Sequence, residues 1–293
     1  MSDPLLRSPG ASAAAIQRHY DLGNDFYALW LDESLTYSCA MWDFGDDLHT
    51  AQLRKIDWHL AHAGDIRGGR ILDIGCGWGS TLRRAVERFG VAHATGLSLS
   101  AAQVSFIERI ATPRIEARLQ GWAEYDSRER CDAIVSIGAF EHFARLDQTP
   151  AEKVSGYRDV FECCRTLLRP GGKLCLQTIT YENADRREFS RFFAEQIFPE
   201  SDLPHLSEIA AASRGLFEIE LLRNDRHHYA RTAREWLTRL QERSDEASAL
   251  VGDDAVQSYR KYLGLLAVGF HTGSMNLARI VMRRFDGRPA RAR

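Results

Sequence analysis

The fold of this chain is decided by Arg70-Ile71-Leu72-Asp73-Ile74-Gly75-Cys76-Gly77-Trp78-Gly79-Ser80. Its first five residues form a short, mainly apolar run bounded by glycine, which is typical of a buried strand in a parallel sheet. The three glycines allow a tight turn and let the backbone approach a ligand closely. A helix that begins near Ser80 would point its free N–H groups at the same place. The stretch therefore predicts a ligand site at the carboxyl end of a parallel strand.

The spacing of the glycines favours one class of nucleotide-binding fold over another. Dinucleotide-binding proteins use G-x-G-x-x-G, whereas here Asp73 begins the pattern Asp-x-Gly-x-Gly-x-Gly. The second strand, within residues 93–100, also ends without the acidic residue that holds the ribose in NAD enzymes. The pattern resembles the first motif of S-adenosylmethionine (AdoMet) methyltransferases. An ordinary strand-to-helix turn without a ligand is the alternative.

The composition is that of an ordinary globular protein. The chain has 293 residues, of which 44% are hydrophobic and 27% charged. A net charge of −2 argues against a nucleic-acid partner. We recognise no secretory signal and no membrane-spanning run, so we expect a cytoplasmic protein. The six cysteines show neither a C-x-x-C pair nor metal-ligand spacing, which predicts reduced cysteines and no metal site.

Apolar segments alternate with helical ones, as a parallel α/β sheet requires. Helical pieces are expected within 13–63, before the sheet, and at 152–168, where apolar residues recur every three or four positions. Two further helices are expected at 232–242 and 255–270. The strands are expected at Arg70–Ile74, Ala92–Leu97, Ile115–Leu119, Ala133–Gly138, Lys173–Ile179, Phe217–Leu222 and Ala278–Arg283.

One domain is expected over residues 13–293, after a loose tail at 1–12. Residues 181–212 interrupt the alternation of strands and helices. The large apolar side chains of this segment are Phe189, Phe192, Phe193, Ile197 and Phe198. We interpret the segment as a helical cap and as a lid for an apolar substrate. The alternative is that these side chains only fill a core.

Polar and aromatic residues follow several strands, at the edge where ligands bind in open α/β sheets. Ser98 and Gln103 follow the second strand, and Trp122 follows the third, where an indole ring could stack on adenine. Glu141 follows the fourth strand among aromatic residues, and an apolar setting could make it a base or a ligand of a small anion. The alternative for Glu141 is a helix-start carboxylate bonded to backbone N–H groups. No basic residue adjoins Cys39, which argues against a nucleophilic thiolate.

Taken together, these stretches resemble the cyclopropane fatty acid synthase family of AdoMet-dependent enzymes, which includes the mycolic acid cyclopropane synthases. The resemblance covers about residues 16–285, nearly the whole chain. The matching stretches are His19–Tyr27, Leu35–Ala40, Asp73–Gly79, Gly96–Ser100, Gly121-Trp122, Ser136–Phe143, Thr178–Thr180, Ile197–Pro199 and His228–Thr232. The resemblance implies a doubly wound, seven-stranded, Rossmann-like sheet of the class I methyltransferase type, with helices before it and a helical cap.

The resemblance also implies the site residues. The residues expected to bind AdoMet are Tyr37, Ser38, Asp73, Gly75, Gly77, Ser98, Gln103, Trp122, Ala123 and Ile137. In the family a bicarbonate ion serves as base, and its ligands here would be the Cys39 backbone amide, Glu141, the Ile179 backbone and Tyr229. The family usually has a histidine on the fifth strand where this chain has Gln177. Glutamine can donate a hydrogen bond but cannot carry a charge, so the sequence leaves open whether bicarbonate binds.

The activity implied is transfer of the AdoMet methyl carbon to a carbon–carbon double bond of an unsaturated acyl chain. A carbocation would form and lose a proton to a base, and aromatic walls such as Tyr20, Trp42, Phe140, Phe143 and Tyr229 could shield the cation. Methylation of an alkene in an isoprenoid or polyketide is the alternative activity, and a non-catalytic AdoMet-binding regulator is the alternative class. Contact with a membrane surface or an acyl carrier is left open, and the sequence predicts no oligomeric state.

Overall fold

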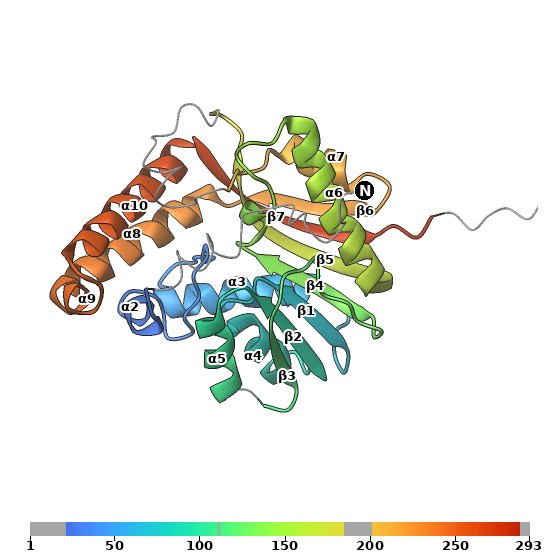
Figure 1. Cartoon of the computed structure of the whole chain (residues 1–293), viewed down its shortest axis with the longest axis horizontal. Helices are drawn as coiled ribbons and strands as arrows, with labels where there is room; N and C mark the ends of the chain where they lie inside the picture. Colours follow the sequence, from blue (N-terminus) through green and yellow to red (C-terminus); the bar gives the residue numbers. More distant parts are fainter. Residues whose placement is uncertain (1–21, 111, 185–200, 288–293) are drawn as a thin grey trace, which may run out of the picture.

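The computed structural model describes residues 22–110, 112–184 and 201–287. In this part of the chain a single sheet has the strand order β3-β2-β1-β4-β5-β7-β6 (Figure 1). The strands β1 to β5 are parallel, and β7 runs antiparallel to both β5 and β6. The strands are β1 (Arg70–Ile74), β2 (His93–Ser98), β3 (Ile115–Leu119), β4 (Cys131–Ile137), β5 (Leu168–Tyr181), β6 (Phe217–Asn224) and β7 (Met275–Arg284). The predicted seven-stranded, doubly wound α/β fold is confirmed.

Helices cover both faces of this sheet. One face carries α3 (Leu48–His62), α4 (Ser80–Glu87) and α5 (Ala101–Ile110). The other face carries α6 (Pro150–Leu167) and α7 (Leu206–Ser213). Successive side chains of a strand point to opposite faces, and Ile71 and Leu72 of β1 accordingly enter the two different cores. This explains why the central strands are apolar at nearly every position.

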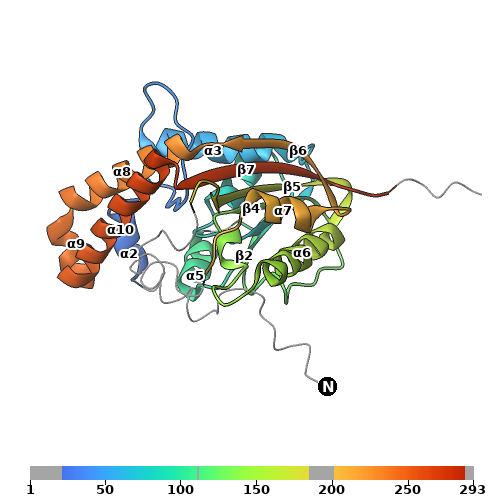
Figure 2. The ribbon, with the colours of Figure 1, turned by 90° about the horizontal axis from the view of Figure 1, so that it is seen from above.

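A third layer of helices stands beyond the end of the sheet (Figures 1 and 2). Its helices are α2 (Asn24–Ala28), α8 (Arg226–Glu242), α9 (Ser244–Val251) and α10 (Asp253–Thr272). They share an aromatic core in which Trp30 and Trp236 are fully buried, with ring centroids 5.8 Å apart. Ile179 near the end of β5 and Leu277 of β7 belong to the same core. The layer therefore closes over the carboxyl end of β5, beside the predicted ligand edge.

Several element boundaries differ from those predicted. Strand β5 extends from Leu168 to Tyr181, and β7 begins at Met275. Helix α8 begins at Arg226 instead of residue 232, because its first turn is polar and shows no apolar periodicity. The short helix α9 was not predicted. Element ends are where hydrophobic patterns carry least information, although the start of β7 is apolar and buried at Met275 and Leu277.

The insertion predicted at 181–212 covers fewer residues than expected, because sheet-packed elements occupy both of its ends. Tyr181 still belongs to β5, and α7 packs against α6 on one face of the sheet. The five large apolar residues on which the cap interpretation depends lie within 185–200, outside the described residues. The predicted tail at 1–12 lies outside them as well.

We predict that Thr149→Ala lowers the free energy of unfolding by about 1 kcal/mol. Thr149 caps α6: its hydroxyl accepts from the Glu152 N–H at 3.3 Å, and the Glu152 carboxylate accepts from the Thr149 N–H at 2.8 Å. Urea denaturation measures the difference. Thr149→Ser keeps the hydroxyl and should match the wild type, and equal losses in the two variants would contradict the capping role.

Candidate active site

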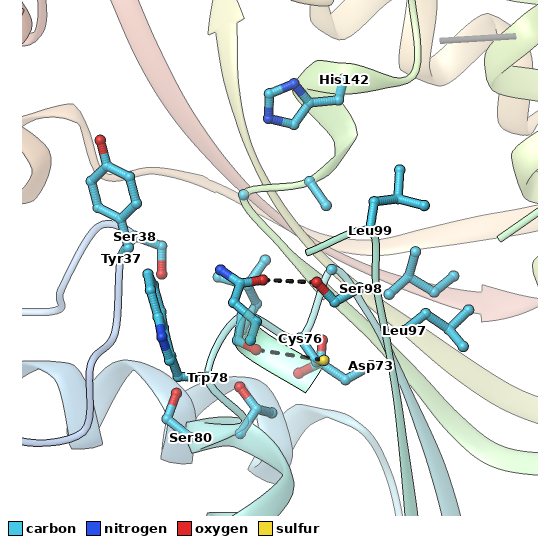
Figure 3. Close-up of a pocket in the computed structure, with 18 of the residues that line it drawn as sticks. Tyr37, Ser38, Asp73, Cys76, Trp78, Ser80, Leu97, Ser98, Leu99 and His142 are labelled. Atoms are coloured by element: carbon cyan, nitrogen blue, oxygen red, sulfur yellow. Dashed lines mark hydrogen bonds between the residues drawn. The ribbon is translucent and has the colours of Figure 1, made fainter. Parts of the chain in front are cut away.

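A cleft opens at the carboxyl ends of β1, β2 and β4. It encloses about 930 Å³ of empty space, including its open mouth. Tyr37, Ser38 and Trp78 stand on one side, facing Ser98 and Leu99 on the other (Figure 3). Nine of the ten residues predicted to bind AdoMet lie on its wall: Tyr37, Ser38, Asp73, Gly75, Gly77, Ser98, Gln103, Trp122 and Ile137. The structure therefore brings together residues that lie up to 100 positions apart in the sequence.

The glycine loop forms the floor of the cleft. The N–H groups of Gly75 and Cys76 both donate to the Leu97 carbonyl at 3.0 Å, which ties the loop to β2. Gly75 has a φ of 83°, and a Cβ at this residue would collide with the Cβ of Ala139. Only glycine fits this position without strain. Gly79 is the N-cap of α4, whose first N–H groups have no partner within the helix.

The opposite wall holds a pre-ordered glutamine. The Ser98 hydroxyl donates to Gln103 Oε1 at 2.8 Å, and both side chains are buried. The Gln103 NH2 group is then the end of the amide that can donate to a ligand. Trp122 lies close to Phe143, with ring centroids 5.8 Å apart, and both rings line the cleft. Ala123 is exposed and does not reach the cleft wall, so the structure does not bring this predicted residue into the site.

Asp73 presents an acceptor to the cleft. Its Oδ1 is buried and has no hydrogen-bond partner among the described residues. Burial raises the pKa of Asp73 to about 7, against the lowering effect of Lys55. A buried polar atom without a partner is costly, and a hydroxyl or ammonium donor of a bound ligand would satisfy it. The donor-rich AdoMet molecule fits this requirement.

Helix α3 supports the site with a buried polar face that the sequence analysis missed. Gln52 Nε2 donates to the carbonyls of Thr36 (3.1 Å) and Ser38 (2.8 Å), and Lys55 Nζ donates to Ser38 Oγ at 2.8 Å. Burial lowers the pKa of Lys55 to about 7. Residues 52, 55 and 59 recur at spacings of three and four, and this periodicity was the available signal.

Glu141 is buried beside the cleft. It lies in a 3-10 turn, Phe140–His142, that follows β4. Its Oε1 accepts from the Ile179 N–H at 2.7 Å, whereas its Oε2 has no partner among the described residues. Burial raises the pKa of Glu141 to about 7, although the Ile179 N–H lowers it. The carboxyl group is thus poised to exchange a proton near neutral pH.

The adjoining His142 lines the cleft and is neutral. Its Nδ1 lies 2.8 Å from the Ser201 hydroxyl, and burial lowers the pKa of His142 to about 4.

Cys39 is a neutral thiol. Burial raises the pKa of Cys39 to about 12, and the opposing charges of Arg279 and Lys55 do not overcome this effect. Arg279 Nη2 lies 3.6 Å from Cys39 Sγ, so the expectation that no basic residue adjoins this thiol is wrong, and it is burial that keeps the thiol neutral. The Cys39 backbone N–H has no acceptor in the part of the chain that the structure describes. It is an available donor next to Ser38, which lines the cleft.

Gln177 lies behind the cleft wall, since its carbonyl accepts from the N–H of Gly138, a cleft residue, at 3.0 Å. Tyr229 of α8 is buried and stacks on Phe270 at 4.2 Å between ring centroids. The hydroxyl of Thr232, three residues further along α8, accepts from the Ala40 N–H at 3.2 Å. These hydrogen bonds pair Gly138 with β5 and Ala40 with α8, and Cys39, Ile179 and Tyr229 belong to one buried cluster.

The remaining expectations concern metals, cysteines and membranes. The six cysteines are free, and no group of residues suited to a metal ion occurs among the described residues. None of the helices described is both long and apolar enough to span a bilayer.

The sheet order, the glycine loop and the cleft define an AdoMet-dependent methyltransferase. Comparison with known proteins is more specific. A profile of the family described as mycolic acid cyclopropane synthetase matches residues 8–280. Cyclopropane mycolic acid synthase 2 of Mycobacterium leprae is 37% identical over 271 residues, covering 85% of this chain and 86% of that protein. The chain belongs to the mycolic acid cyclopropane synthetase family, which confirms the resemblance found in the sequence, and it is an enzyme.

Two solved structures are similar over almost their whole length. The cyclopropane synthase MmaA2 from Mycobacterium tuberculosis has a TM-score of 0.84 and 33% identity. The mycolic acid cyclopropane synthase CmaA1, in complex with SAH and CTAB, has a TM-score of 0.85 and 32% identity. Each comparison covers 94% of this chain and 99% of the other. SAH (S-adenosylhomocysteine) is the demethylated product of AdoMet, so the cofactor class agrees with the cleft.

We predict that Gly75→Ala weakens SAH binding at least about tenfold, because strain of about 1–3 kcal/mol must be relieved by moving the glycine loop. Isothermal titration calorimetry with SAH measures the change. Gly171→Ala is the matched control: Gly171 also has a positive φ (74°), but a Cβ there would meet nothing within 4 Å. An SAH affinity in Gly75→Ala equal to that of this control would contradict the close approach of the loop to the ligand.

We predict a pH-dependent stability difference for Glu141→Gln. Burial raises the pKa of Glu141 from 4.5 to about 7, so the folded protein keeps a proton that the unfolded chain has lost. The stability that this proton supplies is present below pH 4.5 and is lost as the pH rises to about 7. Urea denaturation across this window should show the stability of wild type relative to Glu141→Gln falling with pH. If the stability of wild type relative to Glu141→Gln does not change with pH, the raised pKa of Glu141 is refuted. Glu162→Gln, on the surface of α6, is the control.

Proposed function

We propose that this enzyme transfers the AdoMet methyl carbon to a carbon–carbon double bond of an unsaturated acyl chain, through a carbocation that loses a proton to a base. AdoMet supplies an electrophilic methyl group on its sulfonium when it is bound. The observation that carries the proposal is the buried Glu141, whose Oε2 has no partner beside a cleft that fits AdoMet. Because the chain belongs to this family, a buried acid next to the cofactor cleft supports the proposal that a proton is removed after the methyl carbon has been transferred.

The chain's own residues have distinct tasks in this proposal. Gly75 and the start of α4 receive the cofactor, and Gln103 and Asp73 offer it one donor and one acceptor. The buried surroundings of Glu141 and Cys39 exclude water, which would otherwise capture a carbocation. Glu141 can take up or release a proton at Oε2 near neutral pH.

The residues also fit a bound bicarbonate ion, which would supply a base for the proton lost. The Cys39 N–H is a donor without an acceptor, and Glu141 Oε2 is an oxygen without a partner, among the described residues. Gln177 offers amide N–H groups in the same neighbourhood. The backbone of Ile179 is less available than expected, because its N–H donates to Glu141 and its carbonyl accepts from Thr178.

The structure narrows the set of aromatic side chains that could shield a cation. One face of the Trp42 ring carries the Arg231 guanidinium, 4.0 Å from the ring centroid, so at most the other face could meet a cation. Phe140 stacks on Tyr157 and Phe161 in the core beneath α6. Phe143, on the cleft wall, remains as a candidate, whereas Tyr229 has one ring face stacked on Phe270, and Tyr20 lies outside the described residues.

The acyl substrate is supported by the relatives. Their names specify mycolic acids, which are lipids, and CTAB in the CmaA1 complex is a single-chain detergent. An alkene in a small isoprenoid or polyketide is the competing substrate. Both substrates need the same cofactor cleft and base, so the substrate itself has to be tested.

We predict that the purified enzyme with AdoMet and bicarbonate adds one CH2 group to a mono-unsaturated acyl chain, presented as phospholipid or on an acyl carrier. Mass spectrometry of the released acyl chains detects the gain. Glu141→Gln should lower turnover at least about a hundredfold while SAH affinity is kept, and Glu162→Gln is the matched control. If no acyl substrate gains the mass of one CH2 group, whereas an isoprenoid or polyketide alkene does, the competing substrate is favoured. Full activity of Glu141→Gln would overturn the role of Glu141.

A further inference from the structure

A fully buried arginine lies behind the proposed anion site. Arg279 stands opposite Gln177 in the β5–β7 ladder, and its exposed fraction is 0%. Its Nε donates to Asp225 Oδ2 at 2.7 Å, and its Nη1 donates to Gln177 Oε1. Its Nη2 donates to the carbonyls of Ala40 (3.1 Å) and Cys39 (3.4 Å). One guanidinium therefore contacts two residues of the proposed anion site together with the start of α8.

The guanidinium decides which way the Gln177 amide points. Arginine has donors and no acceptor, so the amide atom that faces it must be the oxygen. The amide nitrogen, Nε2, is then turned away from Arg279, and it has no acceptor among the residues described. His59 Nε2 also lies 3.4 Å from Gln177 Oε1, and this contact is compatible with an amide oxygen that faces Arg279. The available end of Gln177 is a donor, as an anion requires.

The backbone donor of the proposed anion site, the Cys39 N–H, is oriented by Gln52 and Arg279. Gln52 holds the Ser38 carbonyl at 2.8 Å. In a planar trans peptide the next N–H points the opposite way, so the Cys39 N–H is aimed away from α3. Arg279 fixes the two carbonyls that follow, those of Cys39 and Ala40.

Arg279 also supplies a permanent positive charge. Asp225 is shared by two guanidinium groups, because its Oδ1 accepts from Arg223 at 2.8 Å. The set of Arg223, Asp225 and Arg279 therefore carries a net positive charge behind Gln177. A neutral glutamine alone could not attract an anion in this way.

We propose that Arg279 is the positioning residue of the anion site: it turns Gln177 so that the amide N–H donates to bound bicarbonate, in place of the histidine that the family usually has on this strand. The inference rests on the proposed function, because it concerns the base of the same reaction. Arg279 acts through Gln177 and the backbone of residues 39–40, and its own donors are already used.

Gln177→Glu separates this role from a structural one. The carboxylate can still accept from Arg279, so the fold should be kept and the thermal unfolding midpoint should not fall. The second carboxylate oxygen cannot donate, so bicarbonate binding should weaken at least about tenfold. The probe is sodium bicarbonate titrated by calorimetry into the protein saturated with SAH. Gln241→Glu, the same change on the exposed face of α8, is the matched control and should bind bicarbonate as the wild type does.

Arg279→Lys tests the arginine itself. A lysine keeps the charge but cannot bridge Asp225, Gln177 and the two carbonyls together. We expect normal SAH affinity and bicarbonate affinity reduced at least about tenfold, measured below the unfolding temperature. Wild-type bicarbonate affinity in either Gln177→Glu or Arg279→Lys would overturn the inference alone. A wild-type protein that binds no bicarbonate would overturn both the inference and the bicarbonate part of the proposed function, while the methyl-transfer assay would still test the rest.

Discussion

The buried ion pair between Arg279 and Asp225 holds the site to the scaffold. Removing a guanidinium from water is costly, and a buried ion pair is tolerated only when its remaining donors are also satisfied. Here the partners come from four places: the start of α8, β5, and the carbonyls of residues 39 and 40. Because such a charge cannot be left unpaired, these segments are fixed relative to one another. The geometry beside the cleft follows from that requirement.

Burial of the polar side chains from water is the second property that the parts of the site share. Burial raises the pKa values of Asp73 and Glu141 to about 7, and it lowers the pKa of Lys55 to about 7. In each case the low dielectric of the interior disfavours the charged form. The same exclusion of water protects a carbocation and strengthens hydrogen bonds to an anion. One physical cause thus serves both the proton transfer and the cation chemistry that we propose.

Much of the fold could be predicted from the sequence, because the central strands β1 and β4 are short, mainly apolar runs that end at glycine. Strands β1 and β3 have the predicted bounds. The supports of the site could not be predicted in the same way. Gln52, Lys55 and His59 look like one solvent-facing side of α3 until residues 36–40 and β5 bury them. Arg279 did offer a signal, since a charge inside an apolar strand demands a partner, but the sequence does not show that the partner is Asp225.

The cofactor cleft and the proposed base site are joined through one short segment, which would allow one to vary while the other is kept. The side chains of Tyr37 and Ser38 line the cleft, whereas the N–H of the next residue, Cys39, points away from α3 and belongs to the anion site that we propose. Helix α3 holds this segment through Gln52 and Lys55. A glutamine at position 177, where the family usually has a histidine, would therefore leave the cleft residues in place, provided that another group fixes the side-chain amide of Gln177. Since Arg279 reaches Gln177 and residues 39–40 with one planar group, the role that we propose for it would compensate a change at the base site without a change at the cofactor site.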